Sequence, residues 1–323
     1  MIVVQTPLRI SFLGGGTDFE DFYTKHGGAV LTTAINKSVF AIVKERFDDK
    51  IYINYSKKEI VDEVSEIEHE LVRYAMLTTG VKRGVEITTL SDIPSEGSGL
   101  GSSSSVTVAL LHALYTYQGI LVPAERLADD ACFIEIDLCK EPIGKQDQYI
   151  AAYGDLRFLT FSDDEVRAED VWLSDEARRE LNRDLMLLYT GTTRSSGEIL
   201  SKQKENIPNR ITVLNKMTQL AIIGKDALEK GDFCTFGSLL HENWGLKKKL
   251  TSSITNDEID KLYLQALEAG TLGGKLCGAG GGGFLLLYCP KESQTKVREA
   301  LRLRELPVQL EESGSRVIFD YRR

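Results

Sequence analysis

Alternating apolar and polar residues mark the start of the chain. Leu8, Ile10 and Phe12 alternate with polar neighbours, and this period of two predicts a half-buried strand over residues 1–13. Later runs rich in β-branched and aromatic residues predict further strands. These runs cover residues 28–46, 50–56, 84–94, 185–194 (a strand entering a loop), 273–290 (a glycine loop entering a strand) and 315–321.

Apolar residues at helical spacing occupy much of the remaining chain. They predict helices over residues 66–80, 102–118, 122–140, most of 195–269 and 291–305, and a short helix between the Pro142/Gly144 turn and Gly154. In the third of these, four residues spaced four, three and four apart share one face: Leu127, Ala131, Ile134 and Leu138. Glu135 lies roughly 60–80° from the centre of that face at ~100° per residue. The pattern alone therefore favours a solvated position for Glu135 at the edge of a buried surface.

The order of the elements predicts an α+β fold in two domains. The chain has 323 residues, which is long for one core and suits two packed domains. The boundary between the two domains is expected near the acidic stretch over residues 163–176. We therefore expect domains over residues 1–180 and 181–323.

Composition and charge narrow the class of protein. The formal net charge of −9 argues against nucleic-acid binding, so a bound anion needs positive charge gathered locally. The five cysteines lack C-x-x-C spacing and no signal peptide precedes them, which indicates reduced thiols in a cytoplasmic protein. Residues 97–124 are uncharged but too interrupted to span a membrane. The basic run at Lys247 indicates a solvated helix face.

Three glycine-rich loops stand at strand ends or helix starts: Gly14–Asp18, Gly97–Ser105 and Gly278–Gly283. Turns alone explain one such loop, but three indicate backbone that approaches a ligand closely. The familiar nucleotide motifs do not fit. Residues 270–276 have the wrong spacing for a P-loop, and residues 97–101 bring the third glycine too early for a dinucleotide fingerprint.

The second loop leads into a predicted helix, and this combination predicts a phosphate site. The N–H groups of Gly99 to Ser103 would cradle a triphosphate at the positive end of the helix. A hydroxyl of Ser102 or Ser103 would reach the Mg²⁺ that accompanies ATP, with Glu135 as a second ligand.

Phosphoryl transfer also needs a carboxylate at the attacking hydroxyl and a cation for the developing charge. Asp147 follows a glycine turn and is a candidate for the first role. Arg9, a charged residue in an apolar strand, is a candidate for the second. The alternatives are a helix cap for Asp147 and a solvent-facing side chain for Arg9.

Three further basic residues lie in or beside loops rich in glycine and threonine: Lys145, Arg194 and Lys275. Each is either a solvated loop cation or a ligand for a phosphate group of the substrate. Arg194 and Lys145 rank above Lys275 for the second role.

The three loops resemble the signatures of the GHMP sugar and metabolite kinases, in that family's order. "PLRISFLGGGTDF" is similar to the first signature, "IPSEGSGLGSSSS" to the phosphate-binding second and "KLCGAGGGGFLLLY" to the third. Within the family the resemblance is closest to the bacterial D-glycero-D-manno-heptose 7-phosphate kinases, through segments such as "PIGKQDQYIAAYGDL" and "YTGTTRSSGEIL". Gly15-Gly16 stand where galactokinases have Glu-His, which argues against galactose.

The resemblance implies a fold and a reaction. The fold has an N-terminal α+β domain with a left-handed βαβ crossover and a ferredoxin-like C-terminal domain, with ATP between them. The reaction is phosphorylation of the anomeric hydroxyl of heptose 7-phosphate to the 1,7-bisphosphate, for nucleotide-activated heptose and lipopolysaccharide. The alternatives are a fucokinase-like sugar 1-kinase, a mevalonate-type kinase and a non-catalytic sensor of sugar and ATP. We expect a monomer or homodimer whose partner is a small sugar phosphate.

The resemblance also implies residue roles. Ser103 and Glu135 match the magnesium ligands, Asp147 matches the catalytic base and Arg9 matches its charge-stabilising partner. The nucleotide would bind at Gly97, Ser98, Gly99, Leu100, Gly101, Ser102, Ser103 and Ser104. The sugar phosphate would bind at Gly15, Gly16, Thr17, Asp18, Lys145, Arg194, Gly280 and Gly281.

Overall fold

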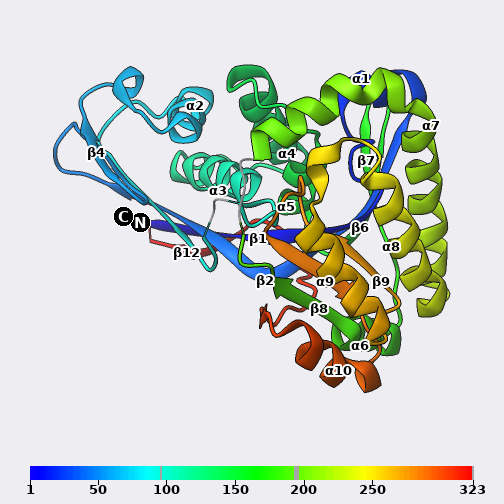
Figure 1. Cartoon of the computed structure of the whole chain (residues 1–323). Helices are drawn as coiled ribbons and strands as arrows, with labels where there is room; N and C mark the ends of the chain where they lie inside the picture. Colours follow the sequence, from blue (N-terminus) through cyan, green and yellow to red (C-terminus); the bar gives the residue numbers. More distant parts are fainter. Residues whose placement is uncertain (95–96, 193–195, 322–323) are drawn as a thin grey trace.

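Two β-sheets, each with helices packed on it, form the framework of the protein (Figure 1). The computed structural model describes residues 1–94, 97–192 and 196–321. The first sheet has the order β12-β1-β2-β5-β3-β4, with β6 paired to β2 and β7 to β6. Its strands are β1 (Ile2–Leu13), β2 (Gly28–Glu45), β3 (Ile51–Asn54), β4 (Lys58–Val61), β5 (Val85–Ser91), β6 (Leu156–Phe161), β7 (Val166–Asp170) and β12 (Arg316–Asp320).

The second sheet is antiparallel and has the order β11-β8-β10-β9. Its strands are β8 (Leu185–Tyr189), β9 (Gly273–Leu276), β10 (Phe284–Tyr288) and β11 (Arg304–Glu305). Every residue of β8 except the last, and all of β9 and β10, is buried, so this sheet is the centre of its own core.

Ten α-helices occur in the described part of the chain, together with three short helical turns. The α-helices are α1 (Glu20–His26), α2 (Glu70–Thr79), α3 (Ser102–Tyr117), α4 (Ala124–Cys132), α5 (Gln146–Tyr153), α6 (Asp175–Asp184), α7 (Ser196–Glu229), α8 (Phe233–Lys247), α9 (Asp257–Glu268) and α10 (Lys291–Leu301). The turns are the 3₁₀ segments η1 (Val64–Glu66) and η3 (Ser252–Ile254) and the π-helix η2 (Phe133–Leu138). Helices α3, α5 and α7 pack on β1 and β2, whereas α8 and α9 pack on β9.

The α+β prediction is confirmed, and most long elements lie where the hydrophobic pattern predicts them. The pattern missed the helices α1 and α6 and the short strands β4, β6, β7, β9 and β11. Strand β9 begins with two glycines, which have low strand propensity, and it is held by pairing with β10. The helix predicted over residues 291–305 ends at Leu301, because Arg302 takes a left-handed conformation with φ of 51°.

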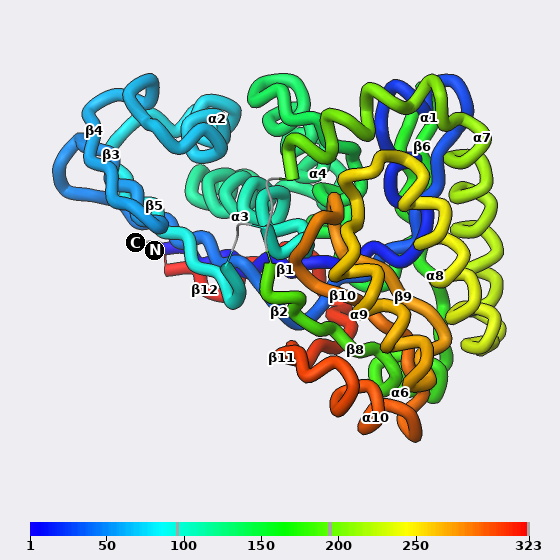
Figure 2. The backbone as a smooth tube through the Cα atoms, in the orientation of Figure 1, coloured from blue at the N-terminus to red at the C-terminus, as the bar shows by residue number. Residues whose placement is uncertain are grey.

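The two ends of the chain meet in the first sheet. Strand β12 pairs antiparallel with β1, so red and dark blue segments lie side by side in Figure 2. The Met1 amine donates a hydrogen bond of 2.6 Å to the Tyr321 carbonyl. The predicted division at residues 180 and 181 falls inside α6, and the C-terminal strand lies in the N-terminal sheet. A division of the chain into domains at that point stays a prediction.

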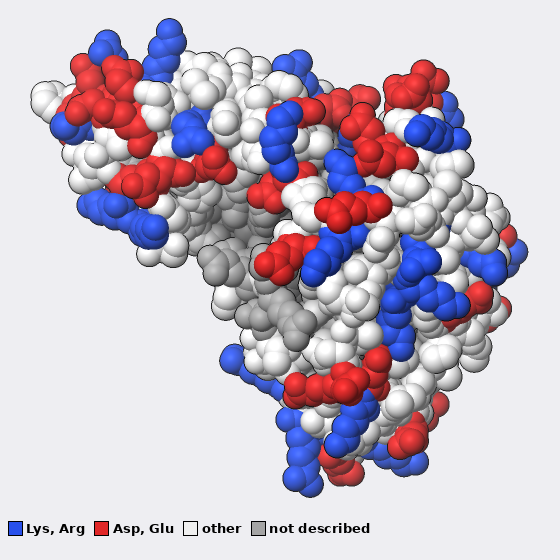
Figure 3. Space-filling model, turned by 45° about the horizontal axis from the view of Figure 1, so that its top comes forward, with Lys and Arg blue, Asp and Glu red and all other residues white. Residues whose placement is uncertain are grey.

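The surface carries both signs of charge. On the face shown in Figure 3, Lys and Arg side chains are interspersed with Asp and Glu. None of the helices described, including the 34-residue α7, combines the length and apolarity needed to cross a membrane.

Candidate active site

The second and third glycine loops touch through their backbones. At Gly99, where φ is +73°, a Cβ atom would lie 2.5 Å from the Cys277 carbonyl oxygen. At Gly278 a Cβ atom would lie 2.5 Å from the Gly99 Cα atom. Only glycine tolerates both the left-handed backbone and this approach. The loop that starts α3 is therefore fixed against the loop that joins β9 and β10 of the second sheet.

Arg9 connects this loop to the rest of the site. Its Nε and Nη2 donate to the two carboxylate oxygens of Asp147 at 2.7 and 2.5 Å, and its Nη1 donates to the Gly99 carbonyl at 2.6 Å. The Arg9 backbone N–H also donates to Leu100 at 2.9 Å. The side chain of Arg9 is 6% exposed and that of Asp147 is 22% exposed, so the solvent-facing alternative for Arg9 is wrong.

Burial lowers the pKa of Arg9, but the charge and hydrogen bonds of Asp147 outweigh it, and the pKa is raised overall. The guanidinium therefore stays charged. A bidentate arginine fixes the plane of a carboxylate as well as its position. Asp147, near the start of α5, is accordingly held in one orientation toward the pocket.

Glu135 is fully buried, so its expected solvated position is wrong. It lies in η2, where the helix widens into π-type turns and Cys139 N–H bonds back to Ile134. A π-helix has a different angular repeat from an α-helix, so the flank position calculated for an α-helix does not apply. Burial raises the pKa of Glu135, and its hydrogen bonds partly offset this.

Four donors satisfy the Glu135 carboxylate. Ser103 and Thr107 donate to Oε1 at 2.9 and 3.2 Å, and Ser104 and Gln148 donate to Oε2 at 2.7 and 2.5 Å. The predicted pair of Ser103 and Glu135 is thus brought together. A hydroxyl and a carboxylate are the hard oxygen ligands that Mg²⁺ takes, and the Ser103 side chain is exposed, so the pair fits this ion.

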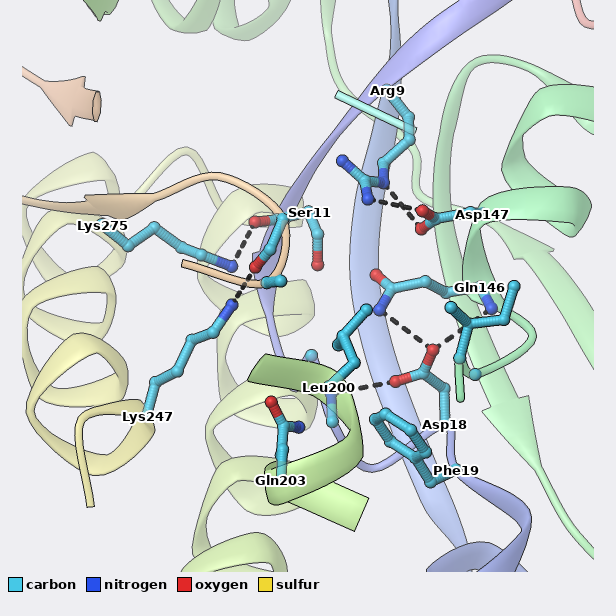
Figure 4. A pocket seen from close by; sticks show the side chains of 16 residues that line it. Arg9, Ser11, Asp18, Phe19, Gln146, Asp147, Leu200, Gln203, Lys247 and Lys275 are labelled. Carbon is cyan, nitrogen blue, oxygen red and sulfur yellow. Dashed lines mark hydrogen bonds and ion pairs between the residues drawn. The ribbon is translucent and has the colours of Figure 1, made fainter. Parts of the chain in front are cut away.

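A pocket opens beside Arg9 and Asp147, with walls from both sheets (Figure 4). Asp18 forms one wall. Its Oδ1 accepts from the Gly16 N–H at 2.9 Å, and its Oδ2 accepts from the Gln146 side chain at 3.0 Å. Burial raises the pKa of Asp18, and hydrogen bonds from backbone N–H groups to its carboxylate partly offset that rise. The cavity is about 80 Å³, well below the roughly 300–1,000 Å³ of typical small-molecule sites.

Two lysines form the opposite wall, and one of them corrects the sequence analysis. Lys247, expected on a solvated face, is 5% exposed and donates to the Gly278 carbonyl at 2.5 Å. Lys275 is 1% exposed and donates to the Ser11 carbonyl at 2.6 Å. Burial lowers the pKa of Lys247 to about 8, and burial likewise lowers the pKa of Lys275 well below its usual value.

The spacing in α8 contained a signal for Lys247. Phe236, Leu240 and Trp244 mark the buried face at intervals of four, and Lys247 follows three residues after Trp244. Ser11 and Gln146 are two further site residues that the sequence did not predict. Each lines the pocket and has a buried side-chain oxygen without a hydrogen-bond partner among the described residues. Ser11 stands two residues after Arg9 on β1, on the same side of the strand.

Comparison with known proteins agrees with this geometry. The model of the GHMP kinases N terminal domain matches residues 69–155, and that of the GHMP kinases C terminal matches residues 225–305. The chain belongs to the GHMP kinases. It is an ATP-dependent sugar kinase, as the relatives described next indicate.

Among curated relatives, the D-glycero-alpha-D-manno-heptose 7-phosphate kinase of Campylobacter jejuni is 29% identical over 93% of both chains. The galactokinase of Thermotoga maritima is 28% identical over 92% of both chains. A solved structure of a D-glycero-D-manno-heptose 1-phosphate kinase from Bacteroides thetaiotaomicron is similar to this chain over the full length of both. The sequence identity is 25% and the TM-score is 0.84.

Among the residues predicted to bind the substrate of this GHMP kinase, Gly15, Gly16 and Asp18 line the pocket. Four other described residues of that prediction do not: Thr17, Lys145, Gly280 and Gly281. Thr17 is buried, and its hydroxyl bonds the backbone of Gly14 and Ala29. The Lys145 ammonium lies 5.4 Å from the Tyr23 ring. Gly280 and Gly281 pack on the Ile254 backbone. Arg194 lies outside the described residues. Their substrate roles stay predictions.

The second glycine loop, predicted to bind the nucleotide, is ordered by its own hydroxyls. Ser98 and Ser102 share a hydrogen bond of 3.2 Å, and the Leu100 N–H donates to Ser98 at 3.4 Å. Gly101 is the left-handed N-cap of α3, so the N–H groups after it start the helix. Gly97 lies at the other end, where its carbonyl is 2.8 Å from a Cβ built on Gly283.

We expect Gly144→Ala to destabilise the kinase, because the new Cβ would lie 2.1 Å from Oδ2 of Asp18. Overpacking of this kind costs about 1–3 kcal/mol. Gly245→Ala in α8 is the matched control, since its Cβ meets nothing within 4 Å, and it should stabilise by about 0.5–1 kcal/mol. Urea unfolding measures both. Equal midpoints for the two variants would contradict the close approach of Gly144 to Asp18.

Proposed function

We propose that this kinase transfers the γ-phosphoryl group of ATP to the anomeric hydroxyl of D-glycero-D-manno-heptose 7-phosphate, giving the 1,7-bisphosphate. The product would enter the synthesis of nucleotide-activated heptose for surface glycans such as lipopolysaccharide. The observation that carries the proposal is the Arg9–Asp147 ion pair, which bonds to the nucleotide loop at Gly99 and faces the pocket. The full-length similarity to two heptose phosphate kinases supports the choice of sugar.

In the proposed reaction, the sugar oxygen attacks the γ-phosphorus, the bond from that phosphorus to the β–γ bridging oxygen breaks, and the hydroxyl proton passes to Asp147. Arg9 holds the Asp147 carboxylate in plane and steadies the charge that develops on the transferred group. The N–H groups at the start of α3 hold the nucleotide phosphates. Asp18 and Gln146 would orient the sugar through its hydroxyls.

A magnesium ion fits the proposed site. Ser103 and Glu135 would hold it, and when bound it would neutralise charge on the nucleotide phosphates. The described residues contain no group of three or more His, Cys, Asp or Glu side chains that could hold a metal. Phosphate oxygens and water would therefore supply most of its ligands, as is usual for Mg²⁺ with ATP.

The test of the proposed function is an ADP-release assay across sugars. The panel contains heptose 7-phosphate, heptose 1-phosphate, unphosphorylated heptose, fucose, galactose and mevalonate. We expect the highest kcat/KM for heptose 7-phosphate and a phosphorus NMR signal of an anomeric phosphate in the product. A preference for heptose 1-phosphate, or for a sugar without phosphate, would overturn the substrate assignment. No turnover of any compound would favour a non-catalytic sensor.

We expect Asp147→Asn to lower kcat by about 10²–10⁴-fold, because the amide cannot take a proton. Nucleotide affinity, measured by calorimetry, should change little. Asp163→Asn is the control, since Asp163 is exposed on the surface. Near-normal turnover of the Asp147 variant would remove this residue from the mechanism.

We expect Ser103→Ala to raise the Mg²⁺ concentration that half-saturates ADP binding by about 10–100-fold, the usual loss when a contact near a metal is removed. The exposed Ser103 side chain makes unfolding of this variant a minor concern. Ser102→Ala is the control, because the buried Ser102 hydroxyl faces Ser98 instead. Identical Mg²⁺ titrations of wild type and Ser103→Ala would rule out Ser103 as a ligand.

A further inference from the structure

Lys247 and Lys275 bring two buried amine groups into one pocket. Lys247 is the last residue of α8 and Lys275 lies in β9, so both come from elements of the second sheet and its helices. Figure 4 shows their ammonium groups converging beside Ser11, across the pocket from Asp18, Gln146 and Asp147. Nothing in the proposed mechanism uses them.

Neither lysine has a carboxylate partner among the residues that the structure describes. Each makes one hydrogen bond, to a backbone carbonyl, and neither forms a salt bridge with a described residue. An ammonium has three donors, so two remain on each lysine. Burial lowers the pKa of Lys275, and the nearby Lys247 charge lowers it further. For Lys247, burial lowers the pKa most and the Arg9 charge adds to this. Buried charges of one sign without a partner are costly, and a bound anion removes that cost.

A second observation points to the same ligand. The Ser11 hydroxyl is buried in this pocket without a hydrogen-bond partner among the described residues. Arg9 is already engaged by Asp147 and Gly99, so it is not the free cation of the pocket. An anion between the lysines would meet their four remaining donors and the Ser11 hydroxyl. A phosphate ester has three acceptor oxygens and about two charges near neutral pH, which matches this set.

We propose that Lys247 and Lys275 form a subsite for the phosphate group that the sugar substrate already carries. The group being transferred belongs at the other side of the pocket, where Arg9 joins Asp147 to the nucleotide loop. The proposal rests on the proposed function, because it requires a substrate that is already phosphorylated. It assigns the distal phosphate to these two lysines in place of Lys145 and Arg194.

The first experiment tests the subsite without turnover. Inorganic phosphate is titrated into the full chain by calorimetry, with the nucleotide site saturated by a non-hydrolysable ATP analogue and Mg²⁺. We expect wild type to bind phosphate and Lys247→Met and Lys275→Met to bind it about 10–100-fold more weakly, as for loss of one charge-assisted hydrogen bond. Lys249→Met is the matched control, since this exposed lysine belongs to the same basic run.

The second experiment uses heptose 7-phosphate and unphosphorylated heptose as substrates. We expect the two variants to raise KM for the 7-phosphate by about 10–100-fold with little change in kcat, and to leave KM for heptose unchanged. A fall in kcat with both sugars would mean that the lysines serve the transferred group, and would overturn the proposal. Substitution by Met removes a buried amine that has no carboxylate partner among the described residues, so both variants should fold. Lys247→Gln and Lys275→Gln provide a second pair of variants.

The two proposals can fail separately. If wild type phosphorylates neither heptose, the proposed function is wrong, and the phosphate titration still decides the subsite. Phosphate binding that the lysine substitutions weaken then supports it. Phosphate binding that is absent in wild type, or equal in wild type and both variants, overturns it.

Discussion

The site depends on the ion pair between Arg9 and Asp147. Through it, strand β1, helix α5 and the nucleotide loop are held by one side chain, which also bonds to the Gly99 carbonyl. The loop cannot shift toward the third glycine loop, because Gly99 already touches the Cys277 backbone. A bidentate arginine in a buried strand therefore gives a glycine-rich loop the fixed position that glycine alone does not provide.

The sequence predicted those site residues whose role follows from a pattern of neighbouring residues. Arg9 stood out because a charge in an apolar strand is unusual. The serines in the first turn of α3 stood out because a helix start binds anions. Most long elements followed from periodicity, since each buries a continuous apolar face. The contact between the second and third glycine loops joins residues far apart in the chain, so no local pattern contained it.

Glu135 and Lys247 show why the positions of other site residues were predicted wrongly. The angle assigned to Glu135 assumed 3.6 residues per turn, and the π-helix η2 breaks that assumption. Lys247 belongs to a basic run whose composition suggests solvent, whereas its spacing from Trp244 places it on the buried face of α8. Composition and periodicity disagreed at this residue, and periodicity carried the physical information, because the face a helix buries is set by angle.

The two sheets contribute different kinds of ionisable side chain to the pocket. The acids of the pocket, Asp18 and Asp147, come from the first sheet and its helices, whereas the lysines come from the second. In the proposed subsite, an acidic chain gathers two lysines without a carboxylate partner among the described residues. A buried cation of this kind costs stability until an anion binds. The pocket lies between these two sets of side chains. An anion held by the lysines and a sugar held by the acids would therefore connect the two sheets through the substrate itself, so binding would stabilise one arrangement of the two walls over others.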